Sequence, residues 1–268
     1  MPAFDLSRSA LDDQVPKDPL DYAISVRDRD VMGMVRDALA QDHCALAFQP
    51  VVLAGPGGKV AFHEGLIRVL DETGRIIPAA QFMDRIEDDR VGRDIDCAAL
   101  ALGFARLREV PGVRLAVNVS ARSLGDGAWR RVLDKALHDD PDLGHRLILE
   151  INEASAMQLP EVVIRFMEEM QPLGVAFGLD DFGAGLTAFR HLKDFFFDLV
   201  KVDSCFVRAI DQDPDNQVIA EALITIAHQF EMFAVAEGVE TAREAEVVTR
   251  FGVDCLQGYY YGVPRFRI

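Results

Sequence analysis

The chain contains eight short apolar segments, and a polar side chain follows each of them. These polar residues are carboxylic acids, amides and one lysine: Gln49, Glu64, Asn118, Glu150, Asp180, Lys201, Glu237 and Gln257. A short apolar run bounded by polar or turn residues is typical of a buried strand. Strands that alternate with helices form parallel sheets, whose carboxyl ends meet at one edge, so we expect these side chains to gather there.

Most of the intervals between these strands carry apolar residues at helical spacing. The spacing predicts helices over 28–43, 79–87, 92–108, 126–138, 158–171, 214–230 and 241–251. Asp126, Asp213 and Thr241 stand where helix N-caps belong. The glycine-rich segment 55–58 is a hairpin-like loop, which makes the first two strands antiparallel. We therefore predict an α/β fold, a (β/α)8 TIM-like barrel whose first strand runs antiparallel.

Length and charge exclude several classes of protein. The 268 residues match one barrel domain, and the net charge of -16 argues against binding of a nucleic-acid polymer. The N-terminus does not resemble a signal peptide, and no apolar run approaches the roughly 18 residues of a membrane span. We therefore expect a cytoplasmic protein without a membrane segment. A flexible polar leader is expected over residues 1–27 and one domain over 28–268.

Two adjacent carboxylates, Asp180 and Asp181, follow an apolar run and precede a glycine-containing turn. Like charges repel, and burial increases the cost, so such a pair is tolerated where a metal cation or a lysine neutralises it. The six histidines and four cysteines show neither Cys-x-x-Cys nor His-x-His spacing. A metal here would therefore have oxygen ligands, which favours Mg²⁺ or Mn²⁺.

Eight motifs, in order along the chain, resemble those of the EAL-domain family of cyclic di-GMP phosphodiesterases. They lie between about residues 45 and 265: Ala47–Val52, His63–Arg68, Val117–Arg122, Leu149–Glu153, Asp180–Gly183, Lys201–Asp203, Ala236–Glu240 and Gln257–Tyr259. The resemblance implies that residues 28–268 form an EAL phosphodiesterase domain. Such a domain is a TIM-like barrel that hydrolyses cyclic di-GMP to the linear dinucleotide pGpG.

The resemblance also implies a pair of divalent ions, Mg²⁺ or Mn²⁺, at the barrel mouth. The first ion would be held by four side chains and the second, or its waters, by three: Glu64, Asn118, Glu150 and Asp180, then Asp180, Asp181 and Glu237. Two ions share the charge of the attacking and leaving oxygens when water attacks a phosphate in line.

By the same resemblance, three side chains have catalytic duties. Lys201 would lie near the nucleophilic water, Glu237 would act as general base, and Glu153 would hold the loop after Asp181. Six more would surround the substrate: Gln49, Arg68 and Gln257 at its guanine or phosphate groups, with Leu66, Asp203 and Glu240 beside them. For Arg68 and Asp203 a purely structural role is the alternative.

Two departures from the family pattern bear on activity. Gly65 stands where the family has alanine, and Ala184 and Leu186 replace a threonine and a tyrosine of the loop after Asp181. Lost hydroxyl contacts in that loop leave open a non-catalytic cyclic di-GMP receptor, or a protein-interaction module built on the same barrel. The presence of every implied metal-ligand acid favours hydrolysis.

A homodimer is implied by the resemblance as well. The consecutive residues Phe195, Phe196 and Phe197 cannot all face inward on a strand or a helix. We therefore expect one of these rings to be exposed, where it would contact a partner subunit. The alternative is that all three are absorbed into the core.

Overall fold

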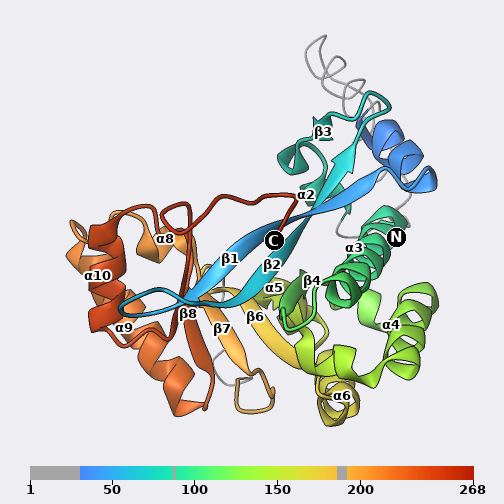
Figure 1. Ribbon diagram of the computed structural model, residues 1–268. Helices are drawn as coiled ribbons and strands as arrows, with labels where there is room; N and C mark the ends of the chain where they lie inside the picture. Colours follow the sequence, from blue (N-terminus) through green and yellow to red (C-terminus); the bar gives the residue numbers. More distant parts are fainter. Residues whose placement is uncertain (1–30, 87–88, 186–191) are drawn as a thin grey trace, which may run out of the picture.

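The computed structural model describes residues 31–86, 89–185 and 192–268. The predicted leader over 1–27 and positions 186–188 of the loop after Asp181 lie outside the described residues. Eight strands close into a barrel (Figure 1): β1 Cys44–Leu53, β2 Val60–Leu70, β4 Leu115–Asn118, β5 Leu147–Asn152, β6 Ala176–Phe182, β7 Leu199–Val202, β8 Phe233–Ala236 and β9 Cys255–Gln257. Strand β1 pairs antiparallel with β2 and β9, and the other barrel pairs are parallel. The predicted barrel with its antiparallel first strand is confirmed.

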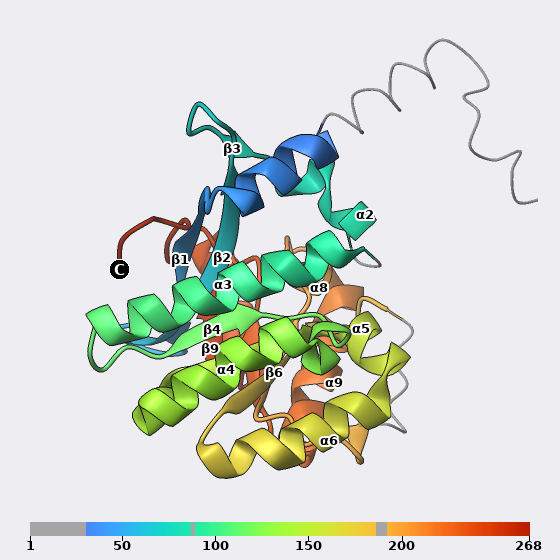
Figure 2. The same cartoon turned by 90° about the vertical axis from the view of Figure 1, so that its right-hand side faces the viewer.

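Helices cover the outside of the barrel, and α3, α4 and α6 lie side by side on one flank (Figure 2). The α-helices are α2 Met83–Ile86, α3 Arg90–Glu109, α4 Gly127–Asp139, α5 Glu153–Gln158, α6 Pro160–Met170, α8 Ser204–Val207, α9 Pro214–Gln229 and α10 Ala242–Arg250, and residues 31–40 are also helical. Short 3-10 turns occupy Ala79–Gln81, Ser123–Gly125, Pro141–Arg146 and Gln171–Leu173. None of the described helices is long and apolar enough to cross a membrane.

Side-chain caps fix where three of these helices begin. The Asp126 carboxylate accepts hydrogen bonds from two backbone N–H groups of α4, and Asp213 does the same for α9. Thr241 forms a capping box with Glu244 at the start of α10. The helix predicted over 158–171 instead begins at Pro160, whose missing N–H suits a first helical position. Helix α8 was not predicted, because four residues are too few to show a helical period.

The barrel interior is built of layers of side chains, and the polar residues form the layer at the mouth. One interior layer is apolar and consists of Val51, Phe62, Ala116, Ile148, Leu199, Val235 and Cys255. Residues two apart on a strand share a face, so the residue two positions nearer the mouth also points inward. On these strands that residue is one of the polar side chains singled out above, from Gln49 on β1 to Gln257 on β9. The mouth therefore carries a polar layer on an apolar floor.

Strands β1 and β2 are longer than the sequence predicted and extend beyond the barrel. Their outer halves pair with β3 Ile76–Ile77 and are covered by helix 31–40, α2 and the start of α3. We call this part the upper lobe (upper right in Figure 1). It has a small core of its own, made of Val31, Val35, Ala38, Val69, Ile77, Phe82, Ile86, Val91 and Ile95.

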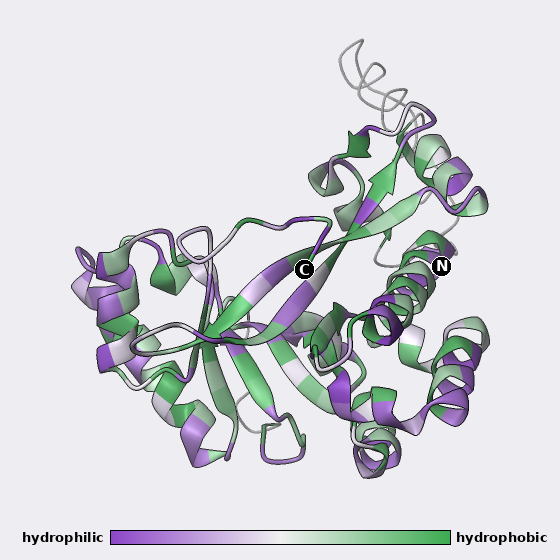
Figure 3. Cartoon of the chain, in the orientation of Figure 1, coloured by the Kyte–Doolittle hydropathy of each residue, from purple (hydrophilic) through white to green (hydrophobic). Residues whose placement is uncertain are grey.

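The main core lies between the barrel and its helices. Its largest fully buried side chains include Trp129, Phe104 and Phe177. Figure 3 shows the same division, with apolar strands inside and polar residues on the outward helix faces. Phe195 and Phe197 are buried with their rings 5.3 Å apart, whereas Phe196 is 53% exposed. The prediction that one of the three rings is exposed is confirmed, and its contact with a partner subunit stays a prediction.

Candidate active site

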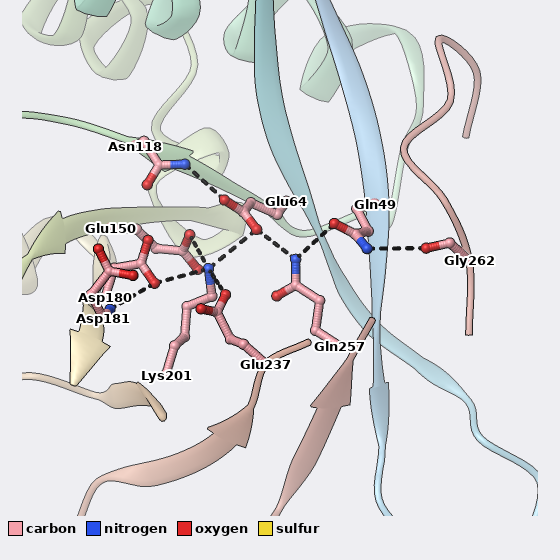
Figure 4. A network of polar contacts seen from close by, with 10 residues as sticks. All are labelled: Gln49, Glu64, Asn118, Glu150, Asp180, Asp181, Lys201, Glu237, Gln257 and Gly262. Carbon is pink, nitrogen blue, oxygen red and sulfur yellow. Dashed lines mark hydrogen bonds and ion pairs between the residues drawn. The ribbon is translucent and has the colours of Figure 1, made fainter. Parts of the chain in front are cut away.

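Lys201 is the centre of the polar layer and contacts four carboxylates (Figure 4). Its Nζ lies 2.7 Å from Glu237, 3.1 Å from Glu150, 3.2 Å from Glu64 and 3.3 Å from Asp180. The four acids come from β2, β5, β6 and the residue after β8, so strands far apart in sequence meet at one ammonium group. Gly178 makes room for this, because a methyl group there would lie 3.0 Å from the Glu150 Cγ.

The site is charge-dense and largely shielded from water. Burial opposes the charge on Lys201, but the surrounding acids, Asp180 first, hold the pKa of its ammonium well above the ordinary value. Burial raises the pKa of Glu150 well above its usual range and that of Glu237 to about 8, against the attraction of Lys201. One ammonium therefore does not neutralise all four carboxylates. Further positive charge at the site would therefore be electrostatically favourable.

The arrangement of the acids fits two divalent cations. Oxygens of Glu64, Glu150 and Asp180 lie within 4.8 Å of one another, and so do oxygens of Asp180, Asp181 and Glu237. Asp180 belongs to both triads and can bridge them. The Glu150 Oε1 is buried without a hydrogen-bond partner among the described residues, as expected of a ligand atom. All the donors are oxygens, which suits Mg²⁺ or Mn²⁺.

Asn118, predicted as a ligand of the first ion, lies next to this cluster. Its Nδ2 donates a 2.8 Å hydrogen bond to Glu64 Oε1. Burial opposes ionisation of Glu64, yet Lys201 and the amides of Gln257 and Asn118 together keep the pKa of Glu64 below its usual value. Glu64 is therefore held as a carboxylate, the form that binds metal.

Asp181 is held in place by its neighbours. Its backbone adopts a left-handed conformation with φ of 56°, which is uncommon for a residue with a side chain and indicates a constrained position. Asn152 donates a hydrogen bond to its carboxylate, and Glu153 accepts one of 3.1 Å from the Gly183 N–H in the turn that follows. Burial, followed by the charge of Asp180, raises the pKa of Asp181 to about 6. Glu153 therefore contacts the loop that the resemblance assigned to it.

Two of the predicted substrate residues form a chain of amides beside the carboxylate triads. Gln257 Nε2 lies 2.5 Å from Glu64 Oε2 and 3.3 Å from Gln49 Oε1, while Gln49 Nε2 donates to the Gly262 carbonyl at 3.0 Å (Figure 4). The Gln257 Oε1 is buried and has no hydrogen-bond partner among the described residues. It is available to accept a hydrogen bond from a ligand.

The remaining predicted substrate residues are placed less uniformly. Leu66 and Glu240 line a cavity of about 260 Å³ beside Glu64 and Glu237. Arg68 lies further along β2, where it donates to the Ile67 carbonyl at 3.0 Å, and it does not line this cavity. Asp203 caps α8 by accepting a hydrogen bond from the Cys205 N–H. The structure thus gives Asp203 a structural contact, next to the carboxylate triads rather than within them.

The carboxylates separate two cavities. The 260 Å³ cavity reaches Glu64 and Glu237 from one side. A second cavity of about 490 Å³ reaches Glu150, Asp180 and Asp181 from the other side, under the upper lobe. A ligand with a phosphate at the acids and a bulky group on each side would fit this arrangement.

Sequence reasoning missed several residues of the site. Asn152 holds Asp181, Arg208 and Tyr259 line the smaller cavity, and Glu244 joins two loops at the mouth. Asn152 lies two residues after Glu150 at the end of β5, so its position on a strand end was a usable signal. Tyr259 belongs to the motif Gln257–Tyr259 but was given no role there. Arg208 and Glu244 follow ordinary helix or turn patterns and carry no such signal.

Comparisons with known proteins agree with the motifs and the fold. The cyclic di-GMP phosphodiesterase PdeR of Escherichia coli is 28% identical over 235 residues, which cover 86% of this chain and 35% of PdeR. The bifunctional diguanylate cyclase/cyclic di-GMP phosphodiesterase MucR of Pseudomonas aeruginosa is 30% identical over 242 residues, covering 86% and 34%. The chain spans about a third of the length of these curated relatives.

A solved structure shows the same architecture. The FimX EAL domain of Pseudomonas aeruginosa, bound to c-di-GMP, superposes with a TM-score of 0.79 at 26% identity, covering 89% of this chain and 97% of that domain. The family model of the EAL domain matches residues 32–264. The barrel with one antiparallel strand, the polar layer at its mouth and these matches agree, and the chain belongs to the EAL domain family.

Proposed function

We propose that this chain is a metal-dependent phosphodiesterase that hydrolyses cyclic di-GMP to linear pGpG. The observation that carries the proposal is the pair of carboxylate triads sharing Asp180, with Lys201 between them. A barrel that only bound a nucleotide would have no need of five acids in two triads, four of them in contact with one lysine. The family's curated relatives PdeR and MucR are phosphodiesterases by name, which supports the same reaction.

The residues have separable duties in this reaction. Glu64, Asn118, Glu150 and Asp180 would hold one cation and Asp180, Asp181 and Glu237 the other, on the oxygens described above. When bound, the cations would neutralise the acids and polarise both the scissile phosphate and a water molecule.

Glu237 is the proposed general base. Its Oε1 lies 2.7 Å from Lys201, and burial raises the pKa of this carboxyl group above the ordinary value, which increases its affinity for a proton. The water oxygen forms a bond to phosphorus as its proton moves to Glu237. The bond from phosphorus to the 3′ oxygen breaks, that oxygen takes a proton from solvent water, and Glu237 returns its proton to solvent, so the net reaction consumes one water molecule. Lys201 provides a fixed positive charge beside the reacting oxygens.

The substrate assignment depends on the two cavities. Cyclic di-GMP is a symmetric dinucleotide, so one phosphate at the acids places a guanosine on each side. The 260 Å³ cavity offers Gln49, Gln257 and Leu66 to one of them, and the 490 Å³ cavity accommodates the other. The FimX domain that shares this fold is bound to c-di-GMP by its title, which supports the ligand class.

Turnover of cyclic di-GMP by the purified protein with Mg²⁺ or Mn²⁺ tests the proposal, with pGpG followed by chromatography. The wild type is expected to form pGpG, and Glu64→Ala is expected to lose activity by more than about a thousandfold, because it removes a metal ligand. Arg243→Ala, at an exposed position of α10, is the control and should keep full activity. If the wild type binds cyclic di-GMP without cleaving it, the chain is a receptor instead.

A further inference from the structure

The smaller cavity, beside the carboxylate triads, is lined by one positively charged side chain that has no part in the proposed catalysis. Among the described residues that line it, Arg208 is the only positively charged one. Arg208 follows α8, and its N–H donates to the Ser204 carbonyl at 2.9 Å, which closes that short helix. A methyl group on Gly238 would lie 3.6 Å from the Arg208 Nε. The guanidinium therefore lies against the backbone next to Glu237.

Arg208 has a partner, but a weak one. Its Nε is 3.8 Å from Glu240 Oε1, and the two side chains are 63% and 50% exposed. An ion pair that is this long and this exposed contributes little free energy. The fork of N–H donors on Arg208 and the carboxylate of Glu240 are thus both available to a ligand at the cavity mouth.

A buried carboxylate holds these two residues side by side. Glu244 Oε1 accepts a 2.7 Å hydrogen bond from the N–H of Ala209, the residue after Arg208. Glu244 Oε2 accepts 2.8 Å hydrogen bonds from the N–H groups of Glu240 and Thr241. The loop after α8 and the loop after β8 are therefore tied to one side chain. The spacing between the Arg208 and Glu240 backbones is fixed before any ligand arrives.

We propose that Arg208 and Glu240 together read the guanine base in this cavity, with Arg208 donating to O6 and N7 and Glu240 accepting from N1–H and the 2-amino group. This inference rests on the proposed function, since it concerns the same dinucleotide. Guanine presents acceptors along one edge and donors along the adjoining one, which meets the donor–acceptor order of the pair. Adenine has an amino donor at C6, where guanine has the O6 acceptor, and an acceptor at N1, where guanine has a donor. It would therefore place a donor against Arg208 and an acceptor against Glu240.

The test compares guanine with adenine ligands in Arg208→Ala, Arg208→Lys and the wild type. The kinetic readout is kcat/KM for cyclic di-GMP and cyclic di-AMP, and the binding readout is the calorimetric Kd for pGpG and pApA. Arg208→Ala should weaken the guanine ligands about tenfold to a hundredfold and leave the adenine ligands within about twofold. Arg208→Lys should behave like Arg208→Ala, because an ammonium lacks the planar fork. Arg243→Ala controls for the loss of one surface charge.

Three outcomes would overturn the inference. If Arg208→Ala weakens guanine and adenine ligands equally and Arg208→Lys restores both, Arg208 contacts a phosphate and does not read the base. If the wild type prefers guanine and every Arg208 variant keeps that preference, base reading lies elsewhere and the proposed function stands. If the wild type neither binds nor cleaves cyclic di-GMP, the proposed function fails and the base assignment fails with it.

Discussion

At the scale of single residues, Lys201 acts as an internal counter-ion for the acids around it. Its side chain is 1% exposed and reaches four carboxylates. Replacing it by the apolar, similarly long methionine leaves those acids without their cation. We expect Lys201→Met to lower the free energy of unfolding by about 3 kcal/mol in EDTA, as for other buried pairs that lose one partner.

Divalent ions should reduce that loss in Lys201→Met, because they neutralise the same carboxylates. Urea unfolding of both proteins, in EDTA and in Mn²⁺, measures the difference. An equal loss in the two conditions would show that the ions do not bind at these acids.

The raised pKa of Glu237 predicts that the stability of the metal-free protein depends on pH. Its pKa is about 8 in the folded chain and near 4.5 when unfolded, so the folded state binds its proton more tightly. This favours folding at low pH, and the advantage is lost as pH rises toward 8. Glu150 and Asp181 are shifted in the same direction. The free energy of unfolding in EDTA should therefore fall between pH 5.5 and 8.5, by up to about 1.4 kcal/mol per pH unit for each proton.

Glu237→Gln keeps the shape of the side chain but has no proton to release. Its free energy of unfolding should fall less steeply over the same pH range, which urea titrations at three pH values would show. Identical slopes for the two proteins would rule out Glu237 as a titrating group there.

Residues that end strands could be predicted from the sequence, and those that act from loops could not. Glu64, Glu150 and Lys201 follow apolar runs, and the parallel sheet brings such positions together whatever lies between them. Arg208 and Glu244 depend on how two loops fold against each other, which has no period in the sequence. Nor does local sequence separate Arg68, which lies further along β2, from residues that line the cavity.

At the scale of elements, the packing of β2 explains why glycine is tolerated at position 65, where the family has alanine. A methyl group at Gly65 would lie 3.3 Å from the Ala116 carbonyl oxygen and 3.3 Å from the Leu46 Cδ1. Glycine generally gives the backbone more freedom, but at this position it fits a tight contact between β1, β2 and β4. We expect Gly65→Ala to lower the free energy of unfolding by about 1 kcal/mol, because this site is already filled.

Gly33 provides the matched control for Gly65→Ala. It lies in helix 31–40, where an added methyl group would meet no atom within 4 Å. Gly33→Ala should raise the free energy of unfolding by up to about 1 kcal/mol through helix propensity. Chemical denaturation of both variants checks the opposite signs, and stabilisation by both would mean that β2 relaxes to admit the methyl group.

At the scale of the whole molecule, the barrel order was predictable but the upper lobe was not. Strand and helix patterns alternate along the chain, and the tight turn at 55–58 makes the first pair antiparallel. The sequence predicted short first strands, because each apolar run was taken to end at the polar residue that follows it, Gln49 or Glu64. In the structure β2 continues to Leu70, and its outer half is stabilised by Val35, Phe82 and Ile95, which lie far from it in sequence. Such long-range packing leaves no local pattern.

The length of β1 and β2 has a mechanical consequence. Each strand runs without a break from the upper lobe to the barrel mouth, where Gln49 and Glu64 face each other in register. From Arg68 to Glu64 the distance along the strand is about 13 Å. The upper lobe therefore shares two continuous strands with Gln49 and Glu64, whereas the other acids lie on strands that end at the mouth. Because both strands are continuous from the lobe to the mouth, we expect a displacement of the lobe to move Glu64 and Gln49 relative to the other residues of the site.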